Sequence, residues 1–273
     1  MDDDAYYMQV RSAYDRIAPV YDESVGKSAI SRRAKQLALR TVKGLSPSGG
    51  LLLDIGCYTG IEALLLAQQG FRIVGVDLSP EMIRIAEAKA KKRRLQEHVR
   101  FEVLRASDIG ALLQRGYGPF DTAYSVYGTL NLEPRIRDFK AGILALLKRH
   151  GNFVCGLLNP TVLYELIMAP LALKFHGYRK LAKNRVRTRI GLGSDTVEAF
   201  LYTPEDFSEL MEPEFRLKEV RGLHVLYPPP RGARGSSLWW IPRALDPLEL
   251  LIEAKFPFSH LGFFTLLTFT KAS

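Results

Sequence analysis

The chain has 273 residues, of which 47% are hydrophobic, and its 38 Lys and Arg against 29 Asp and Glu give a formal net charge of +9. This composition indicates one soluble domain with a large core, and it excludes a disordered or low-complexity chain. No uninterrupted run of about 18 apolar residues is present, so a membrane-spanning helix is not expected. The opening MDDDAYY is acidic and unlike a signal peptide. Cys57 and Cys155 have no CxxC or histidine neighbour at metal spacing, which predicts free thiols, a cytoplasmic protein and no metal site.

The first element is predicted at residues Arg11–Glu23, RSAYDRIAPVYDE. Tyr14, Ile17 and Tyr21 recur there at helical spacing. The pattern predicts a helix with these three side chains on its packing face.

The stretch Leu51–Gly60, LLLDIGCYTG, predicts a buried strand, a sharp turn and a helix over Ile61–Gln69. Gly56 and Gly60 allow the backbone to turn and to approach a ligand closely, because they have no Cβ. Thr59 is the predicted N-cap of the helix, which would leave free N–H groups facing a ligand.

A second apolar strand follows in Phe71–Ile83, FRIVGVDLSPEMI, and its tip is Asp77, 21 residues after Gly56. A carboxylate at this place can accept both hydroxyls of a ribose, which indicates a nucleoside-containing cofactor. Ser79 and Pro80 then predict the cap and the first residue of another helix.

Two residues discriminate between cofactors. The dinucleotide motif G-x-G-x-x-G needs a second glycine two residues after the first, where the diphosphate approaches, and this chain has Tyr58 there. Asp54 would repel a diphosphate but suits the ammonium of a methionine moiety, directly or through water. Both features favour S-adenosylmethionine over NAD.

Further strands and a helix continue the alternation. They are predicted at Val99–Leu104, Phe120–Val126 and Asn152–Leu158 for the strands and at Glu133–Lys148 for the helix. Asp108 follows the first of these strands, where it can cap a short helix at Ile109–Gln114 or contact the cofactor.

An insertion over about Thr161–Thr203 begins with an apolar helical pattern that Pro170 breaks. It continues into Lys174–Arg189, predicted to be a basic helix with seven Lys and Arg and no Asp or Glu. Three interpretations stay open: a solvated face on a lid, contact with an anionic membrane surface or acceptor, and contact with nucleic acid.

The remaining elements are predicted in order as follows: a hairpin over Ile190–Tyr202 turning at Gly193–Asp195, a helix capped by Thr203 with Pro204 first, a strand over Arg216–Tyr227, a second insertion over Arg231–Leu261 with a helix near Leu245–Ala254, and a final strand over Gly262–Lys271. Trp239 and Trp240 in the second insertion are either acceptor-pocket or core residues.

The run Asp54-Ile55-Gly56-Cys57-Tyr58-Thr59-Gly60 resembles the motif D-x-G-C-G-T-G of the class I S-adenosylmethionine-dependent methyltransferases, with Tyr58 in place of the middle glycine. Arg11–Glu23 resembles the N-terminal segment of the ubiquinone and menaquinone biosynthesis methyltransferases. Ser125–Pro134 resembles an S-x-F-G-x-L-N-x-x-P pattern of related small-molecule enzymes, with Tyr127 in the aromatic position.

The resemblance implies roles for particular residues. Tyr21 would close over the cofactor, Leu78 and Met82 would flank the adenine, Asp108 would accept a hydrogen bond from the adenine amino group, and the N–H of Ile109 would reach a ring nitrogen. Tyr58 either tilts over the methionine moiety or points outward. The implied cofactor-binding residues are Tyr21, Asp54, Gly56, Cys57, Tyr58, Gly60, Asp77, Leu78, Met82, Ser107, Asp108, Ile109 and Ser125.

These observations predict an α/β fold with a doubly wound, mostly parallel seven-stranded sheet, whose last strand runs antiparallel between the fifth and sixth. Residues 1–273 form a single domain with a cofactor-binding half at 1–158 and lid insertions at 159–203 and 231–261. The predicted function is methyl transfer from S-adenosylmethionine to oxygen or carbon of a small, partly apolar metabolite that is amphipathic or anionic. An RNA methyltransferase and a non-catalytic cofactor-binding protein are the alternatives. Tyr127, His224 and Tyr14 are the candidates for a general base, none at a known catalytic motif, and peripheral membrane contact is expected through 161–189.

Overall fold

The computed structural model describes residues 2–23, 29–163, 166–167, 185–189, 195–226 and 241–272. Most of the apolar segment after Thr161, the first part of the basic block, the turn of the predicted hairpin and the pair Trp239 and Trp240 lie outside these residues. The predictions made for them stay predictions.

A seven-stranded sheet in the order β3-β2-β1-β4-β5-β9-β8 forms the centre of the fold. Its strands are β1 (Leu51–Ile55), β2 (Arg72–Asp77), β3 (Val99–Val103), β4 (Phe120–Ser125), β5 (Leu147–Leu158), β8 (Phe215–Leu223) and β9 (Phe264–Lys271). β1 to β5 pair in parallel, and β9 is antiparallel to both β5 and β8. The predicted fold class and the antiparallel place of the last strand are therefore confirmed.

Neighbouring residues along each strand belong to two separate hydrophobic cores, one on each face of the sheet, because successive side chains point to opposite faces. Leu52 of β1 packs with one set of helices, whereas Leu53 packs with the other. Both leucines are fully buried. This explains why the strands read as continuous apolar runs: both faces of the sheet are covered.

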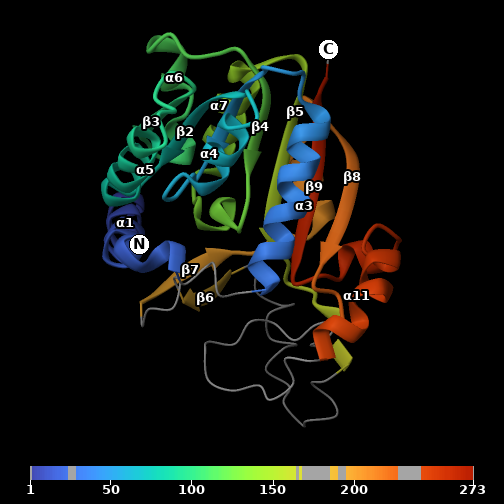
Figure 1. Cartoon of the computed structure of the whole chain (residues 1–273). Coiled ribbons are helices and arrows are strands. Elements are labelled where there is room, and N and C mark those ends of the chain that lie inside the picture. Colours follow the sequence, from blue (N-terminus) through green and yellow to red (C-terminus); the bar gives the residue numbers. More distant parts are fainter. Residues whose placement is uncertain are drawn as a thin grey trace.

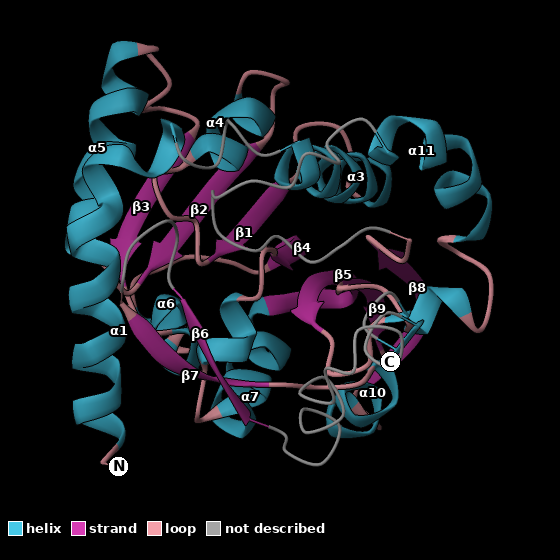
Figure 2. Cartoon of the chain, turned by 90° about the horizontal axis from the view of Figure 1, so that it is seen from below, coloured by secondary structure: helices cyan, strands magenta, loops and turns pink. Residues whose placement is uncertain are grey.

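Helices cover the two faces in Figure 2. On one side lie α3 (Ala29–Leu45), α4 (Ile61–Ala67) and α5 (Pro80–Lys92), and on the other lie α6 (Ala111–Gln114), α7 (Ile136–Leu146) and α10 (Pro204–Met211). The first residue of α10 is Pro204, and Thr203 and Asp206 form a capping box there, as the sequence predicts for its cap. Helix α11 (Ile241–Ile252) lies at the periphery, beside α3.

A third apolar cluster lies at the carboxyl edge of the parallel strands. The N-terminal helix α1 (Asp3–Ile17), followed by the 3₁₀ turn η1 (Ala18–Val20), packs there against Tyr58, Met82 and Val197. The helix begins eight residues before the predicted segment, which starts at Arg11. In Figure 1 α1 and the β6–β7 ribbon lie below the sheet, at the end where the candidate ligand-binding turns are.

The prediction that the basic block is helical is wrong for its last part. Arg185–Arg189 is strand β6, and it pairs antiparallel with β7 (Thr196–Phe200), so that Arg185 faces Phe200 and Arg189 faces Thr196. The sequence RVRTR alternates charged and β-branched residues, which is the period of a strand and not of a helix. The predicted hairpin therefore begins at residue 185 instead of 190.

No helix among the described residues is both long and apolar enough to cross a membrane.

Phe153 of β5 tests the packing of the second core. Its ring is fully buried and lies 5.7 Å from the ring of Phe139 and 6.2 Å from that of Phe269, between centroids. We expect Phe153→Ala to lower the free energy of unfolding by about 3–5 kcal/mol, because it removes apolar contacts and leaves a cavity. Denaturant unfolding measures this. Leu113→Ala on α6, where the leucine is 45% exposed, is the control and should change stability by no more than about 0.5 kcal/mol. Equal losses in the two variants would contradict the described core.

Candidate active site

The turn after β1 is a backbone arrangement that two glycines make possible. Gly56 has φ of 73°, and a Cβ there would lie 2.3 Å from the Thr129 hydroxyl. Gly60 has the same φ, and a Cβ there would lie 2.8 Å from the Phe101 ring. Both positions favour glycine on conformation and on space, so the predicted turn is confirmed.

Tyr58 occupies the place where the related motif has glycine, and it adopts the left-handed conformation with φ of 48°. Its ring points inward and is 6% exposed. It stacks on Tyr21 at 4.9 Å and tilts against Tyr14 at 5.6 Å. Its hydroxyl is 3.2 Å from the Thr129 hydroxyl. Of the two predicted orientations, the inward one is therefore observed, and aromatic packing offsets the strain of the positive φ.

Asp77 ends β2 with its carboxylate buried at the same turn. One oxygen accepts a hydrogen bond from the backbone N–H of Tyr58 and the other from that of Ser79, both at 2.9 Å. Burial raises the pKa of Asp77 to about 6, although both backbone hydrogen bonds act in the opposite direction. Each oxygen keeps a second lone pair, so the carboxylate can still accept bonds from a ligand.

Asp54 lies deeper than predicted. Its side chain is 1% exposed, and burial raises the pKa of its carboxyl well above the usual range, with the charge of Glu62 adding to the rise. Glu62 pairs with Lys35 at 2.9 Å. Asp54 does not line the cavity described below.

Thr59 does not cap α4, so this prediction is wrong. The N-cap is Gly60, without a side-chain hydrogen bond. The Thr59 hydroxyl instead donates to Asp22, which also pairs with Lys89, and Lys89 donates to the Thr59 carbonyl at 3.0 Å. Asp22 in the N-terminal segment therefore binds the Thr59 hydroxyl that would otherwise cap the helix.

Ser79 does cap α5, as predicted, by accepting from the backbone N–H of Met82 at 3.1 Å. Its hydroxyl donates to Asp15 of α1 at 2.5 Å. The end of β2 is therefore tied to the N-terminal helix as well as to the glycine turn.

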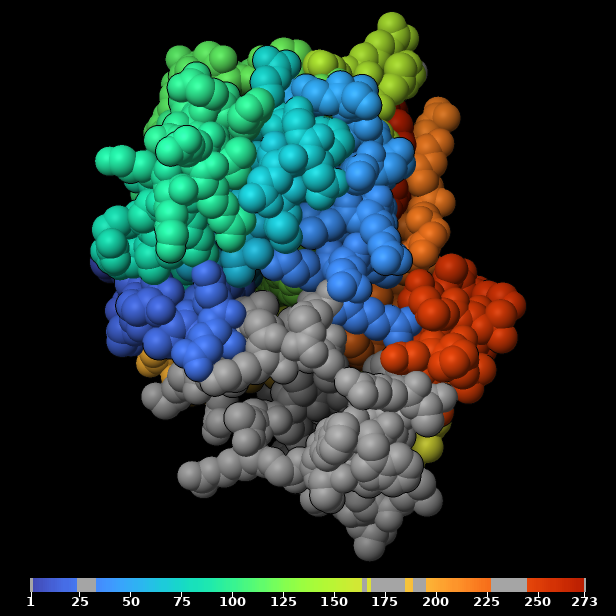
Figure 3. Space-filling model, in the orientation of Figure 1, coloured from blue at the N-terminus to red at the C-terminus, as the bar shows by residue number. Residues whose placement is uncertain are grey.

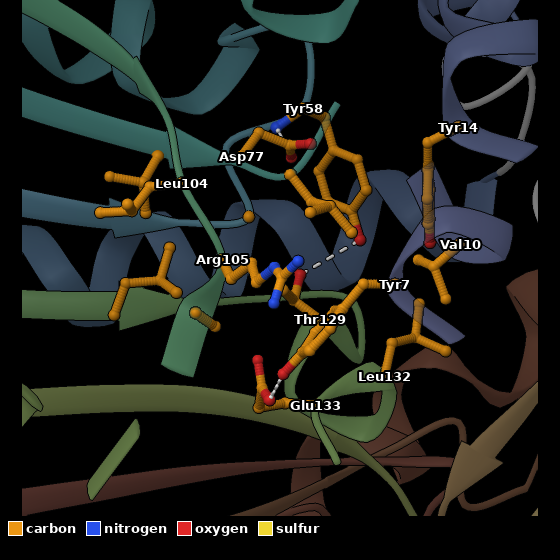
Figure 4. A pocket seen from close by; sticks show the side chains of 15 residues that line it. Tyr7, Val10, Tyr14, Tyr58, Asp77, Leu104, Arg105, Thr129, Leu132 and Glu133 are labelled. Atoms are coloured by element: carbon orange, nitrogen blue, oxygen red, sulfur yellow. Dashed lines mark hydrogen bonds between the residues drawn. The ribbon is translucent and has the colours of Figure 1, made fainter. Parts of the chain in front are cut away.

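A cavity that is open to solvent lies between α1 and the carboxyl ends of the strands (Figure 4). Its wall is formed by Tyr7, Val10, Tyr14, Ile55, Gly56, Tyr58, Val76, Asp77, Leu78, Leu104, Arg105, Ala106, Thr129, Leu132 and Glu133. Gly56, Tyr58, Asp77 and Leu78 were predicted from the sequence, and so was Tyr14 as a candidate base.

Glu133 is the second carboxylate of this wall, and it is 2% exposed. It accepts the Tyr7 hydroxyl, and it also accepts the backbone N–H groups of Ser107 and Arg135 at 3.0 Å and 2.9 Å. Figure 4 shows the Tyr7 hydroxyl aimed at it from α1. The Arg105 guanidinium lies 4.4 Å from the centre of the Tyr7 ring. Burial raises the pKa of Glu133.

Other predicted residues lie outside the wall. Those from the cofactor set are Tyr21, Asp54, Cys57, Gly60, Met82, Ser107, Asp108, Ile109 and Ser125, and those from the base set are Tyr127 and His224. Most are buried immediately behind the wall: Met82 and Ile109 are fully covered, and Ser107 bonds to Glu133.

Asp108 is the exception, because its side chain is 37% exposed and pairs with Arg135 at 3.5 Å. It also does not cap a helix. The 3₁₀ turn η2 (Ala106–Asp108) contains it, and α6 begins only at Ala111 with Gly110 as N-cap. That part of the prediction is wrong, because Asp108 lies inside the 3₁₀ turn and its carboxylate contacts Arg135 and the Ser107 hydroxyl instead of a helix N-terminus.

Tyr7, Thr129 and Glu133 were missed. Tyr7 was detectable, because Tyr7 and Val10 extend the helical spacing of Tyr14, Ile17 and Tyr21 by two turns toward the N-terminus. Thr129 and Glu133 bound the short turn η3 (Thr129–Leu132), whose spacing carries no periodic signal.

No group of three or more His, Cys, Asp or Glu side chains in the described ranges is close enough to hold a metal ion.

Comparison with known proteins gives matches of three kinds. Residues 52–151 match the family described as a methyltransferase domain. The chain is 35% identical over 134 residues to the erythromycin 3''-O-methyltransferase of Saccharopolyspora erythraea, covering 48% of this chain and 41% of that protein. It is 32% identical over 151 residues to the ubiquinone/menaquinone biosynthesis C-methyltransferase UbiE of Citrifermentans bemidjiense, covering 54% of this chain and 61% of that protein. The chain thus spans about half the length of these relatives.

Among solved structures, the fold is similar to that of the 1,6-didemethyltoxoflavin-N1-methyltransferase of Burkholderia thailandensis, which was crystallised with S-adenosylhomocysteine. The TM-score is 0.57 at 17% identity, with 98% of this chain and 90% of that chain covered.

The buried Asp77 generates a prediction for the ligand-free protein. Its pKa is raised from 3.8 to about 6 in the folded state, so the folded protein binds the proton more tightly than the unfolded chain does. This tighter proton binding adds about 3 kcal/mol to the free energy of unfolding. The contribution is fully present below pH 3.8 and is lost as pH rises through about 6. Unfolding free energies of the wild type and Asp77→Asn across this pH range measure it. Parallel pH dependences in the two proteins would contradict the assigned pKa.

Proposed function

We propose that this chain is an S-adenosylmethionine-dependent methyltransferase that transfers the methyl group to an oxygen or carbon of a small, partly apolar metabolite. The bound cofactor supplies a sulfonium methyl group that is already activated. The protein then has to align the acceptor and exclude water.

The observation that carries this proposal is the meeting of Asp77 and Gly56 at one cavity. Asp77 presents a buried carboxylate with spare lone pairs, which suits the two hydroxyls of a ribose. Gly56 gives the turn its positive φ and lets the Thr129 side chain pack against it, and both residues line the cavity. Leu78, Leu104 and Ala106 supply apolar wall beside Asp77, which suits a planar base. The residues present therefore fit the cofactor, with Asp77 as the ribose acceptor.

We assign the acceptor to the part of the cavity bounded by α1. Val10, Tyr14 and Leu132 give that wall an apolar character, and Glu133 adds one buried carboxylate. A small molecule with an apolar body and a polar group suits such a wall. The erythromycin and UbiE relatives bear the names of an O- and a C-methyltransferase, which supports oxygen or carbon as the position.

The two tyrosines among the candidate bases are poor proton acceptors at neutral pH. Burial raises the pKa of Tyr14 well above its usual range and raises that of Tyr127 as well, so both phenols hold their protons. His224 is buried outside the cavity wall. We therefore assign the protein's role in transfer to positioning, which suits an acceptor that loses its proton readily.

A second candidate is a protein that binds the cofactor without transferring its methyl group. Tyr58 favours it, because its ring occupies the turn where the related motif has glycine and its hydroxyl reaches Thr129 across the cavity. Methyl transfer to a panel of amphipathic phenols separates the two. Transfer by the wild type supports the enzyme, whereas transfer that appears only in Tyr58→Gly supports the second candidate.

Calorimetric titration with S-adenosylhomocysteine tests the cofactor site. We expect Asp77→Asn to weaken binding by about 10- to 150-fold, because a charge-assisted acceptor is lost. Wild-type binding should strengthen as pH rises through about 6, because the ionised carboxylate is the better acceptor. Glu97→Gln changes an exposed acid to its amide and should leave affinity unchanged. An Asp77→Asn protein that binds like the wild type would overturn the assigned role of Asp77.

A further inference from the structure

Helix α11 turns its carboxylates toward the body of the protein. Glu249 is 1% exposed and accepts the backbone N–H groups of Val225 and Leu226 at 2.9 Å and 3.1 Å. Glu253, just after the helix, is 4% exposed and bonds to Arg33 of α3 at 3.0 Å. These acids fix α11 to the end of β8 and to α3, so the orientation of the helix is well determined.

The opposite side of the helix is apolar and exposed. We call it the α11 apolar face, and it consists of Leu248, Leu250 and Leu251 of the helix and Phe256 after its end, which are 46%, 63%, 59% and 78% exposed. Figure 3 shows the orange-red segment that contains α11 projecting at the edge of the molecule. A surface helix of a globular protein ordinarily turns its apolar stripe to the core and its charges to water. Here three leucines of one helix are exposed while the two acids Glu249 and Glu253 are buried, and exposed apolar side chains gathered in this way mark an interaction site.

Within residues 247–257 the exposed charge has one sign, and Glu205, an acid of another element close to this stretch, pairs with His260 at 3.3 Å. The exposed residues between 247 and 257 are Pro247, Leu248, Leu250, Leu251, Ala254, Lys255, Phe256 and Pro257, so the only charge among them is positive. The acids of the same stretch, Glu249 and Glu253, are both buried. Asp246, just before it, pairs with Arg33 at 3.2 Å. The chain as a whole carries a net charge of +9.

We propose that the α11 apolar face binds the surface of an anionic lipid bilayer. Leucine and phenylalanine side chains insert at the boundary between headgroups and acyl chains, and a neighbouring lysine interacts with the anionic headgroups. A second copy of the chain fits less well. In a two-fold pair the face would meet itself, and no anion on it would balance Lys255.

This inference goes beyond the proposed methyl transfer and does not depend on it, since lipid binding is measured without turnover. It also places the membrane contact on α11, whereas the sequence had suggested residues 161–189.

Co-sedimentation of the full chain with vesicles tests the proposal. The vesicles contain equal parts of phosphatidylcholine and phosphatidylglycerol, and vesicles of phosphatidylcholine alone test the need for charge. We expect the double variant Leu250→Glu, Leu251→Glu to lower the fraction bound to anionic vesicles by at least about tenfold. Leu113→Glu on α6 replaces a leucine that is 45% exposed, and it is the matched control that should bind like the wild type.

Circular dichroism and thermal unfolding establish whether the variants are folded. We expect them to be folded, because the substituted leucines are exposed. Lys255→Glu adds an independent test, because it should weaken binding to anionic vesicles while leaving binding to neutral ones unchanged. A wild type that stays in solution with anionic vesicles overturns the proposal. Wild-type dimers in light scattering that Leu250→Glu, Leu251→Glu dissociates would also overturn it, in favour of a second copy as the occupant.

Discussion

The candidate site depends on how one buried carboxylate is satisfied. Asp77 ends its strand where almost no water reaches it, so its oxygens need donors from the protein. The backbone N–H groups of Tyr58 and Ser79 are those donors, and they belong to the turn after β1 and to the start of α5. A single side chain thus fixes the two loops that bound the cavity. The fixed distance between β1 and β2, set by their parallel pairing, allows one carboxylate to reach both.

The N-terminal segment is attached to the same loops by separate polar contacts. Asp15 accepts the Ser79 hydroxyl, Asp22 accepts the Thr59 hydroxyl, and Tyr7 donates to Glu133 on the far wall. The rings of Tyr21 and Tyr58 stack between them. The segment therefore forms a wall of the cavity whose position is set at both ends. Replacement of the usual glycine by Tyr58 adds to this attachment, because glycine would give Tyr21 nothing to stack on.

The sheet could be read from the sequence because its signals are local. Leu51–Ile55 and Arg72–Asp77 are apolar runs of strand length that end in turn residues, and Gly56 and Asp77 have a spacing that places them at one edge. The capping of α5 by Ser79 was equally local. What failed was decided by distant partners: Thr59 bonds to Asp22 instead of capping α4, and the strand at Arg185–Arg189 is visible only through its alternation, which the density of positive charge obscured. Glu133 gave no signal, because two of its three donors, Tyr7 and Ser107, are remote in the sequence.

The contacts of α1 also determine when this helix can reach its final place during synthesis. Tyr7 bonds to residue 133, and the Tyr6 hydroxyl donates to the carbonyl of Glu198 at 2.7 Å, across 192 positions of sequence. A ribosome adds about 5–20 residues each second, so roughly 10–40 seconds separate the appearance of the helix from that of its last partner. During that time α1 can already pack on Tyr58 and Met82, but Tyr6 lacks the carbonyl that its hydroxyl contacts in the folded protein. The docking of the first helix of this sequence is therefore completed late, after β7 has been made.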